Sequence, residues 1–457
     1  MTSALGRLWG SPGLTSITAT GARAAAFFVP VPFISAAFDT SVVALWFLII
    51  TFQSLTALAI GNLPIILMHM VAHARADTSA SDERIAKIAL GIRRVFNVAV
   101  IIYITLAIFL FTPLLWRQIS LTGDQIAAFG TWSLFVAGMV CRIRTLPYTT
   151  YLLGLNEVAL VRRMEAISWL VGGIGSAIGL MVWANLVWAM ALMQAPAIIN
   201  LISMKMFANR KKWGVALARR IDGDAEIWSE LRPRAIRGAI GVIAAYLTVY
   251  GSSIIYAQFG DSASIASFSF TVTLFGLISQ LANSQTMSAL PAMSGAYAAR
   301  RLDEMRAIAR KTMTRSLVLY LAMTIIIFTG LSLVAAMAPR ALPVLETRIW
   351  ILFGLAHLVV RYASFHLHFY TITNDIKWHI YHLGTAAIYF PLIVLFGPAS
   401  PATYPIALLI SASVFSAPYA RRQSLVKFEF KFSDERPQII LSMAATLAAT
   451  ALLLFYK

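Results

Sequence analysis

Long apolar runs separated by short polar segments recur along the whole chain. Most of these runs reach about 20 residues, the length of α-helix that crosses a ~30 Å hydrocarbon core. No segment shows the period-two alternation over about 10 residues that is typical of a transmembrane β-barrel. The pattern therefore predicts an all-α polytopic membrane protein. The expected spans are residues 14–37, 41–72, 93–116, 126–155, 164–182, 185–206, 234–258, 262–296, 312–338, 347–373, 378–397, 402–420 and 438–456.

The polar segments between the runs divide the chain into parts. The longest of them, residues 207–233, has the composition of an amphipathic helix that lies at the membrane interface. We expect it to link a six-helix lobe at 1–206 to a second six-helix lobe at 234–420. The remaining residues, 421–457, are expected to form a basic loop and an extra C-terminal span.

The composition supports a membrane protein. Of the 457 residues, 59% are hydrophobic and 12% are charged, and the mean hydropathy is +0.76. A soluble domain could not cover its surface with so few polar groups. A net charge of +18 would point to nucleic acid in a soluble chain, but here the basic residues lie mainly in alternate loops. That is the positive-inside pattern, so we expect no nucleic-acid partner.

The distribution of Lys and Arg also predicts the orientation. With the N-terminus in the cytoplasm, the outside loops hold Arg117, Arg340 and Arg348, and Lys457 ends the chain. Most of the 37 basic residues then fall in or beside the cytoplasmic loops. Because such a bias sets membrane topology, we expect a multi-pass protein with a cytoplasmic N-terminus.

The two halves of the chain resemble each other. Asp39 and Asp261 stand at outer turns, and each is followed by a long helix that ends in a basic inner loop. An Asn followed by an acid, at 156–157 and 374–375, ends the fourth and the tenth spans. Arg142 and Arg144 precede the first of these pairs by about the distance at which Arg361 precedes the second. Three matches in register indicate an internal repeat, and an even number of helices per repeat makes it a parallel one. Repeats of this kind are typical of transporters, with the substrate site between the repeats.

The stretch from Asp39 through Ala44-Leu45-Trp46, with a polar-interrupted helix running on to a basic loop, resembles bacterial polysaccharide flippases. These are the O-antigen and exopolysaccharide (Wzx-type) members of the multidrug/oligosaccharidyl-lipid/polysaccharide exporter superfamily. The resemblance covers most of residues 15–420. It implies two six-helix lobes in a V around a central cavity, alternating access, and a bacterial inner membrane. It also implies a lipid-linked oligosaccharide and membrane lipids as partners, with a polysaccharide polymerase and chain-length proteins beside them.

Four arginines lie inside the expected spans, and carboxylates are nearly absent from the same depth. A guanidinium in mid-bilayer costs at least ~3 kcal/mol, so it survives only where it faces protein, a wet cavity or an anion. Such a set of cations predicts a cavity for a negatively charged cargo. The four residues are Arg23, Arg142, Arg144 and Arg361.

The tenth span carries a long polar stripe. His357, Arg361, Ser364 and His368 recur at helical spacing, with Asp375 further on, and therefore share one face. Such a face cannot meet lipid, so we favour a cavity lining over a contact with a neighbouring helix. Because no Glu or Asp stands at ligand spacing from the histidines, we expect no metal site.

The fourth span places two arginines on different sides. Arg142 and Arg144 lie about 200° apart around the helix, so we expect one of them to pack against a neighbouring element. Tyr148 and Tyr151 follow on the face of Arg144. Tyrosines beside a polar cavity suit sugar rings, whereas ordinary helix packing is the alternative interpretation.

The first span contains Pro30 and Pro32 after Arg23. Prolines kink a transmembrane helix and free carbonyls that must be satisfied elsewhere. We expect this helix to bend and to act as a gate. Arg23 has a second interpretation, in which its side chain reaches the inner headgroups.

Motifs for an enzyme are missing from the sequence: it has no Gly-rich phosphate loop, nucleophile elbow or HExxH, so we expect no catalysis and no cofactor. The leading hypothesis is a flippase that moves a polyprenyl-pyrophosphate-linked oligosaccharide outward, with the arginines on the pyrophosphate. The alternatives are a lipid II flippase and a cation-coupled multidrug exporter, which would call for mid-membrane carboxylates. A membrane glycan polymerase or ligase would carry large outside loops, which the spans do not leave room for.

Overall fold

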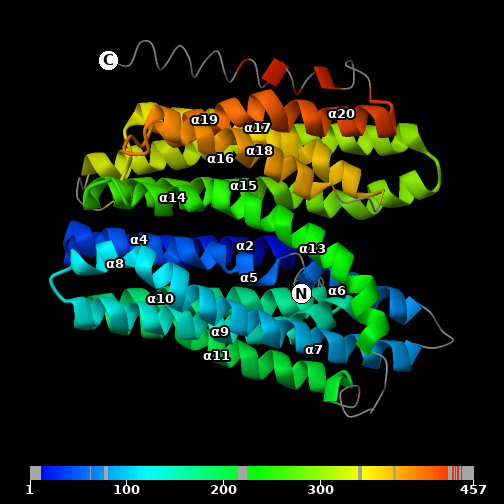
Figure 1. Ribbon diagram of the computed structural model, residues 1–457, viewed down its shortest axis with the longest axis horizontal. Helices are drawn as coiled ribbons and strands as arrows, with labels where there is room; N and C mark the ends of the chain where they lie inside the picture. Colours follow the sequence, from blue (N-terminus) through cyan, green and yellow to red (C-terminus); the bar gives the residue numbers. More distant parts are fainter. Residues whose placement is uncertain are drawn as a thin grey trace, which may run out of the picture. The chain divides into compact units, whose positions relative to one another are not determined.

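The computed structural model is built of helices, with no strand in the residues that it describes (Figure 1). Eleven helices of this described part are long and apolar enough to cross a membrane. The prediction of an all-α polytopic membrane protein is therefore confirmed. The described residues are 12–61, 63–76, 81–214, 224–337, 342–373, 377–430, 435, 436, 438, 440, 441 and 444.

The chain forms two compact units, Met1–Ile243 and Ala244–Lys457, and the boundary between them falls in the sequence of one helix, α13 (Asp224–Val249). In the N-terminal unit, α9 packs along α11, and α10 packs against both α2 and α11. Its other elements are α2 (Pro12–Phe28), α3 (Val31–Ala37), α4 (Thr40–Leu55), α5 (Ala57–Ile60), α6 (Leu63–Ala76), α7 (Ser81–Leu106), the π-helix η1 (Ala107–Phe111), α8 (Thr112–Ser120), α9 (Gln125–Gly154), α10 (Val158–Trp183) and α11 (Leu186–Arg210).

The C-terminal unit is organised around two helix contacts. α15 packs along α16, and α17 packs against α19 and α20. Its elements after α13 are α14 (Gly251–Tyr256), α15 (Ser262–Ala298), α16 (Leu302–Met337), α17 (Thr347–Thr371), α18 (Trp378–Phe396), α19 (Thr403–Ser411), the π-helix η2 (Ala412–Ser416) and α20 (Ala417–Phe428).

Most of the predicted spans correspond to these helices. The seventh, predicted at 234–258, is the exception, because its apolar helix is the shorter Ile236–Val249. The polar segment predicted at 207–233 is described in part, and its last residues belong to α13. The thirteenth span, at 438–456, falls almost wholly outside the described residues. The V-shaped arrangement around a central cavity stays a prediction.

Prolines account for three interruptions of the spans. α2 ends at Phe28 and α3 begins at Val31, with Pro30 as its N-cap, so the predicted break in the first span is confirmed. Pro113 and Pro418 each occupy the first turn of a helix, α8 and α20, that follows a π-helical turn. Proline has no N–H to donate to the preceding turn, and a π-turn accommodates the lost hydrogen bond.

The internal repeat is visible at the starts of α4 and α15. Asp39 is the N-cap residue of α4, and Asp261 is the N-cap residue of α15. The Asp261 carboxylate accepts hydrogen bonds from the Ser264 backbone N–H at 3.0 Å and from the Ser264 hydroxyl at 2.6 Å. These bonds hold the pKa of the Asp261 carboxyl below its usual value. The second match of the repeat joins residues 156–157 to residues 374–375. Residues 156–157 are described, whereas 374–375 lie outside the described residues.

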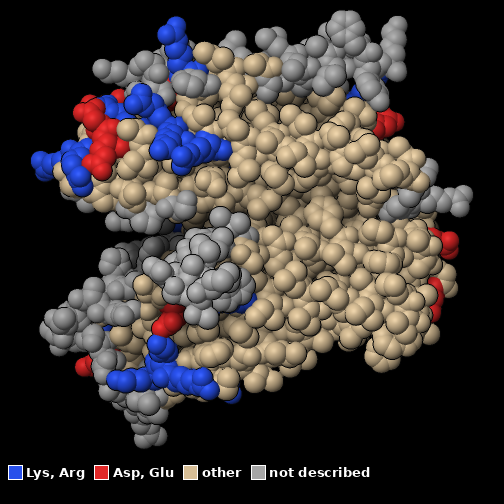
Figure 2. Space-filling view, turned by 180° about the vertical axis from the view of Figure 1, so that it is seen from behind, with Lys and Arg blue, Asp and Glu red and all other residues tan. Residues whose placement is uncertain are grey.

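The charged side chains gather at the ends of the helices. In Figure 2 the Lys and Arg side chains cluster there, and a broad surface without charge lies between the ends. Many large apolar side chains of the described residues are exposed, including Phe109, Ile126, Met181 and Val394. This is the pattern of a helix bundle whose solvent at mid-height is lipid rather than water.

Candidate functional site

Each unit carries an arginine well inside one of its long helices. Arg142 lies 12 residues before the end of α9 (154 − 142), and Arg361 lies 10 residues before the end of α17 (371 − 361). At a rise of 1.5 Å per residue, the Cα atom of each arginine therefore lies about 15–18 Å from the end of its helix, near the middle of a hydrocarbon layer. We describe the two sites separately, as the Arg142 cluster and the Arg361 cluster.

The Arg142 cluster depends on a close approach of α2 to α10. Ala19 and Ala22 on α2 pack against Ala166 on α10, with Trp169 beside them. At Gly173, one turn further along α10, a Cβ atom would lie 2.5 Å from the Cα of Ala26, so only glycine permits this spacing. Small residues let helix backbones approach closely in membrane proteins. The approach brings Arg23 on α2 and Trp169 on α10 together.

Trp169 is the centre of this cluster. The guanidinium carbon of Arg142 lies 4.0 Å from the centroid of its ring, and that of Arg23 lies 5.5 Å from it. Arg142 also donates from Nε to Oε1 of Gln194 on α11, at 3.5 Å. One indole therefore holds two arginines by cation–π contact, an interaction that strengthens when the cation is removed from water.

Positive charge is in excess around Arg142. Arg23 and Glu165 both lie close enough to act on it electrostatically, and Glu165 is the one Asp or Glu among the described residues to do so. That carboxylate already pairs with Arg162, whose Nη1 lies 2.7 Å from its Oε2. Arg23 Nε is buried and has no hydrogen-bond partner among the described residues. Glu165 thus serves both Arg162 and Arg142, and the positive charge of Arg23 adds to theirs, so positive charge exceeds negative charge in this cluster.

The remaining fourth-span residues lie away from Trp169. Arg144 is exposed on α9, and Tyr148 lies close enough to Arg144 and Arg93 to interact with both. Tyr151 is buried: its hydroxyl donates to the Lys211 carbonyl at 2.8 Å. The prediction that one of the two arginines packs against a neighbouring element is confirmed, and it is Arg142. The contacts of Tyr151 favour the packing interpretation of that residue.

Arg361 is the most deeply buried of the four arginines, with 5% of its surface exposed. Its Nε and Nη2 atoms are buried and have no hydrogen-bond partner among the described residues. No described carboxylate pairs with it, and the Tyr381 hydroxyl acts on it electrostatically. A buried charge without a partner is strongly unfavourable, so Arg361 is a candidate for contact with a ligand that supplies acceptors.

Polar groups from three elements surround Arg361. The His368 imidazole lies close enough to interact with it, and its Nδ1 donates to the Ser364 carbonyl at 2.6 Å. On α18, Tyr381 lies beside Ser364 and also beside Ser416 of η2. These residues, with Arg361, form the Arg361 cluster. They offer a guanidinium, an imidazole and hydroxyl groups within one small volume.

His357 does not join this cluster. It is 4% exposed, and its ring stacks on Phe275 at 5.3 Å and lies 6.3 Å from Phe353. The structure thus gives the predicted stripe two parts: an aromatic contact at His357, and a polar cluster from Arg361 to His368. Asp375, which extends the stripe, lies outside the described residues. No group of three or more metal-binding side chains occurs in the part of the chain that the structure describes.

Two kinds of residue were missed by the sequence reasoning. Trp169 and Gln194 gave no signal, because an isolated aromatic or amide in an apolar run is ordinary in a helix bundle. Tyr381 and Thr385 did give one, since they recur at i and i+4 on an apolar helix and so mark an inward face. Thr385 donates to the Tyr381 carbonyl at 2.7 Å and lies 2.6 Å from the Ser416 hydroxyl.

Comparison with known proteins places the fold. No protein-family model matches the chain, and no curated protein matches its sequence. Among solved structures, the inward-facing conformation of a multidrug resistance MATE family transporter of the MOP superfamily matches with a TM-score of 0.66 and 12% identity, over 89% of this chain and 95% of that chain. The lipid II flippase MurJ, in its inward closed conformation, matches with a TM-score of 0.65 and 13% identity, over 96% and 92%.

These matches define the fold. An outward-facing MATE family transporter also matches, with a TM-score of 0.61 and 12% identity, over 92% of this chain and 97% of that chain. The chain therefore has the fold of the transporters and flippases of the MOP superfamily, and it is a multi-pass membrane protein. The superfamily expected from the sequence agrees with this fold.

Proposed function

We propose that this protein is a flippase for a polyprenyl-pyrophosphate-linked oligosaccharide in a bacterial inner membrane. It would move the sugar from the cytoplasmic to the outer leaflet, for O-antigen or exopolysaccharide export. The lipid II flippase among its structural matches supports a lipid-linked cargo. The observation that carries the proposal is the buried Arg361, whose Nε and Nη2 lack partners among the described residues.

A pyrophosphate satisfies what Arg361 lacks. Two of its oxygens can accept the paired N–H groups of one guanidinium edge, a bidentate and charge-assisted contact. Neighbouring hydroxyl and imidazole groups of the Arg361 cluster add further hydrogen bonds. Arg142 and Arg23 offer a second set of cations, held by Trp169 and only partly neutralised by Glu165. Each cluster is suited to an anionic group, whereas the polyprenyl chain would stay in the lipid.

The membrane potential can drive this transport. Moving negative charge outward is favoured by an inside-negative potential, by ~2.3 kcal/mol per charge for each 100 mV. A pyrophosphate diester carries enough charge to gain from it without a nucleotide, which agrees with the missing phosphate-binding loop.

A cation-coupled multidrug exporter is the second candidate, and the MATE transporters among the structural matches support it. Lipophilic cations call for a free carboxylate inside the membrane. Glu165, the carboxylate beside Arg142, is already paired with Arg162. The two clusters therefore favour an anion. A lipid II flippase has a cargo of the same chemistry, and the sugar that is carried would distinguish it.

The first prediction concerns Arg361. Replacement Arg361→Ala should abolish export of the sugar polymer and accumulate polyprenyl-linked repeat units on the cytoplasmic leaflet, with protein abundance near normal. Arg361→Lys should restore export only in part, because an ammonium keeps the charge but loses the planar two-pronged contact. Both are measured by lipid extraction and by surface polymer on cells.

The matched control is Arg348→Ala, at an exposed position in the first turn of the same helix. It should export polymer at close to the wild-type rate. Wild-type export by Arg361→Ala would make Arg361 a structural residue and remove the cargo-binding role. Loss of drug resistance with normal polymer export would favour the exporter instead.

A further inference from the structure

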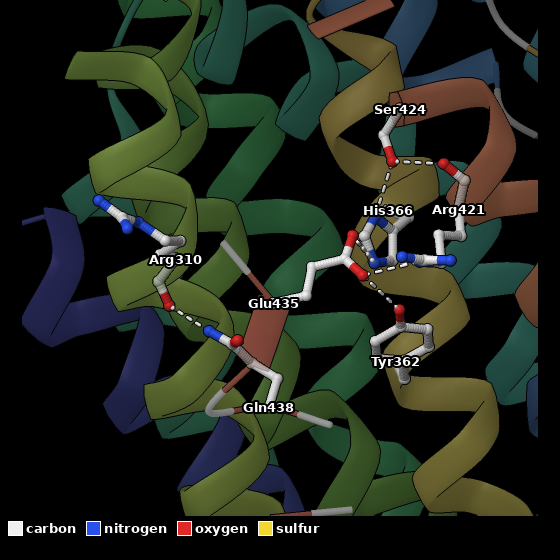
Figure 3. A network of polar contacts seen from close by, with 7 residues as sticks. All are labelled: Arg310, Tyr362, His366, Arg421, Ser424, Glu435 and Gln438. Atoms are coloured by element: carbon white, nitrogen blue, oxygen red, sulfur yellow. Dashed lines mark hydrogen bonds and ion pairs between the residues drawn. The ribbon is translucent and has the colours of Figure 1, made fainter. Parts of the chain in front are cut away.

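The chain returns to the C-terminal unit after α20. The Glu429 carbonyl accepts from Arg306 Nη1 on α16 at 2.9 Å. Further along, Gln438 Nε2 donates to the Arg310 carbonyl, also on α16, at 3.2 Å (Figure 3). We call the described residues of 429–441 the C-terminal segment. It is attached to α16 at these two points.

Between the two points, Glu435 is buried, with 1% of its surface exposed. Its Oε2 accepts from Arg421 Nε on α20 at 2.7 Å and from the Tyr362 hydroxyl on α17 at 3.1 Å (Figure 3). Hydrogen bonds to an ionised group are among the strong ones in proteins. One carboxylate oxygen therefore joins the C-terminal segment to both α17 and α20.

An aromatic ring gives the segment a further contact with α17. Phe430 is 5% exposed, stacks on Phe369 with centroids 5.8 Å apart, and lies edge-on to His366 at 6.4 Å. At about 100° per residue, Phe369, His366 and Tyr362 lie within about 60° of one another around the helix. The segment thus contacts one face of α17.

Arg361 lies on a different side of the same helix. It is about 80–140° around α17 from the three contacted residues, whereas Ser364 and His368 of the Arg361 cluster lie within about 60° of it. A helix turns about its axis as one body, so a contact that holds one face also fixes the direction of the others. The segment therefore determines which way the Arg361 side chain points.

The N-terminal unit repeats this arrangement. Trp213, which follows α11, is 3% exposed and packs edge-on against Tyr148 and Tyr151 of α9, with centroids 5.6 Å and 4.9 Å apart. The offset of the internal repeat is 218 residues (374 − 156). Moved by this offset, Tyr148 and Tyr151 correspond to His366 and Phe369. In each unit, an aromatic residue after the last span therefore contacts the same two positions of the fourth span.

We infer that Glu435 is a positioning residue for Arg361. By joining the C-terminal segment to Tyr362 and Arg421, it fixes α17 in the orientation that aims the Arg361 guanidinium into its cluster. Direction matters for a guanidinium, because its planar fork makes a bidentate contact only when it is aligned with its acceptors. The attachment follows from the contacts of Glu435, and its effect on a cargo rests on the proposed function.

Transport in liposomes at several concentrations of the fluorescent polyprenyl-pyrophosphate oligosaccharide tests this role. Glu435→Ala should raise the half-saturating concentration about tenfold, the effect of one lost hydrogen bond to a charged group, with the maximal rate close to that of the wild type. Tyr362→Phe cuts only the link to α17 and keeps the Arg421–Glu435 pair, so it should raise this concentration about threefold. Glu435→Gln, whose amide oxygen still accepts, should recover part of the loss.

The matched control is Glu429→Gln, an exposed side chain of the same segment, which should behave as the wild type. The same changes are then placed in Arg361→Lys. Because an ammonium has no planar fork to aim, Glu435→Ala and Tyr362→Phe should each change the half-saturating concentration by less than about twofold in this background. Equal effects in both backgrounds would overturn the inference, since Glu435 would then act without Arg361.

Hydrogen exchange measured by mass spectrometry, on the full chain in lipid nanodiscs without cargo, tests the attachment itself. In Glu435→Ala the α17 peptide that contains Tyr362 and Phe369 should exchange about tenfold faster than in the wild type, with a peptide of α9 unchanged. Unchanged exchange in α17 would also overturn the inference. A wild type that does not transport the charged lipid would remove the proposed function, and exchange in α17 would still decide whether Glu435 holds this helix.

Discussion

At the scale of single residues, the arginines differ in the groups that compensate their positive charge. Arg142 has an indole face, an amide oxygen and a share of Glu165, so it is held in place within the protein. Arg361 has no comparable set among the described residues, and this difference makes it the stronger candidate for cargo contact. Arg142 would then act as a fixed positive field and Arg361 as a direct hydrogen-bond donor.

The amide that holds Arg142 depends on a glycine, which gives the next prediction. A Cβ atom at Gly138 of α9 would lie 2.5 Å from Gln194 Oε1 and 2.6 Å from its Cγ. Gly138→Ala should therefore displace Gln194 and destabilise the protein by about 1–3 kcal/mol, the usual cost of overpacking. Thermal unfolding in detergent measures the change.

The control for this prediction lies on the same helix. A Cβ atom at Gly130 would meet Val187 Cγ2 at 3.7 Å, an ordinary contact. Gly130→Ala should be neutral or stabilising by up to about 1 kcal/mol, because alanine favours helix. Equal destabilisation by both variants would show that α9 tolerates no added methyl group, and that the Gln194 contact is not the cause.

The sequence predicted residue roles where a signal was local. An arginine inside an apolar run stands out because its cost is known, so the sequence singles out all four, and their role in cargo binding stays a prediction. The partners were not found, because they come from other helices and because Trp169 and Gln194 belong to residue types that are common in any bundle. Glu435 was missed for the same reason: it belongs to a segment that reads as a polar loop, and its partners lie on α17 and α20.

At the scale of helices, the hydrophobic pattern predicted the spans well and their interruptions less well. Length and hydropathy determine where a helix can cross, so most boundaries agree within a few residues. The π-turns at η1 and η2 were not predicted, although Pro113 and Pro418 mark both. A proline near the end of an apolar run changes the local helical winding but leaves the hydropathy unchanged. The hydropathy therefore does not tell a π-helical turn from an α-helical one.

The repeated Asp residues give a prediction at the same scale. Asp261 caps α15 through Ser264, whereas Asp39 makes no capping hydrogen bond at α4. Asp261→Ala should therefore cost about 1 kcal/mol of stability and Asp39→Ala much less. Because the folded state lowers the pKa of Asp261, its contribution is present above the unfolded pKa of about 3.9 and is lost as the pH falls below it.

Chemical denaturation of both variants at neutral and at acidic pH measures these differences. The difference in the free energy of unfolding between wild type and Asp261→Ala should become smaller at acidic pH. The corresponding difference for Asp39→Ala should stay small at both pH values. A larger effect of Asp39→Ala than of Asp261→Ala would contradict the capping assignment.

At the scale of the whole molecule, the chain has a fold that transporters and flippases share, and the cargo that we propose follows from the charge of the two clusters. The MATE transporter and the lipid II flippase match nearly the whole chain at 12% and 13% identity. One fold therefore accommodates unlike cargoes, and function depends on the site rather than on the fold. Here the buried arginines outnumber the carboxylates near them, which favours an anionic lipid.

The most direct test of this account is transport by the purified protein in liposomes. A polyprenyl-pyrophosphate oligosaccharide with a fluorescent sugar is placed in the bilayer, and its appearance in the opposite leaflet is followed with a membrane-impermeant quencher. We predict transport that accelerates when the arriving side is made positive, that excludes the uncharged polyprenyl-linked analogue, and that is lost in Arg361→Ala but kept in Arg348→Ala. Equal movement of the charged and uncharged lipids, or undiminished transport by Arg361→Ala, would contradict the account.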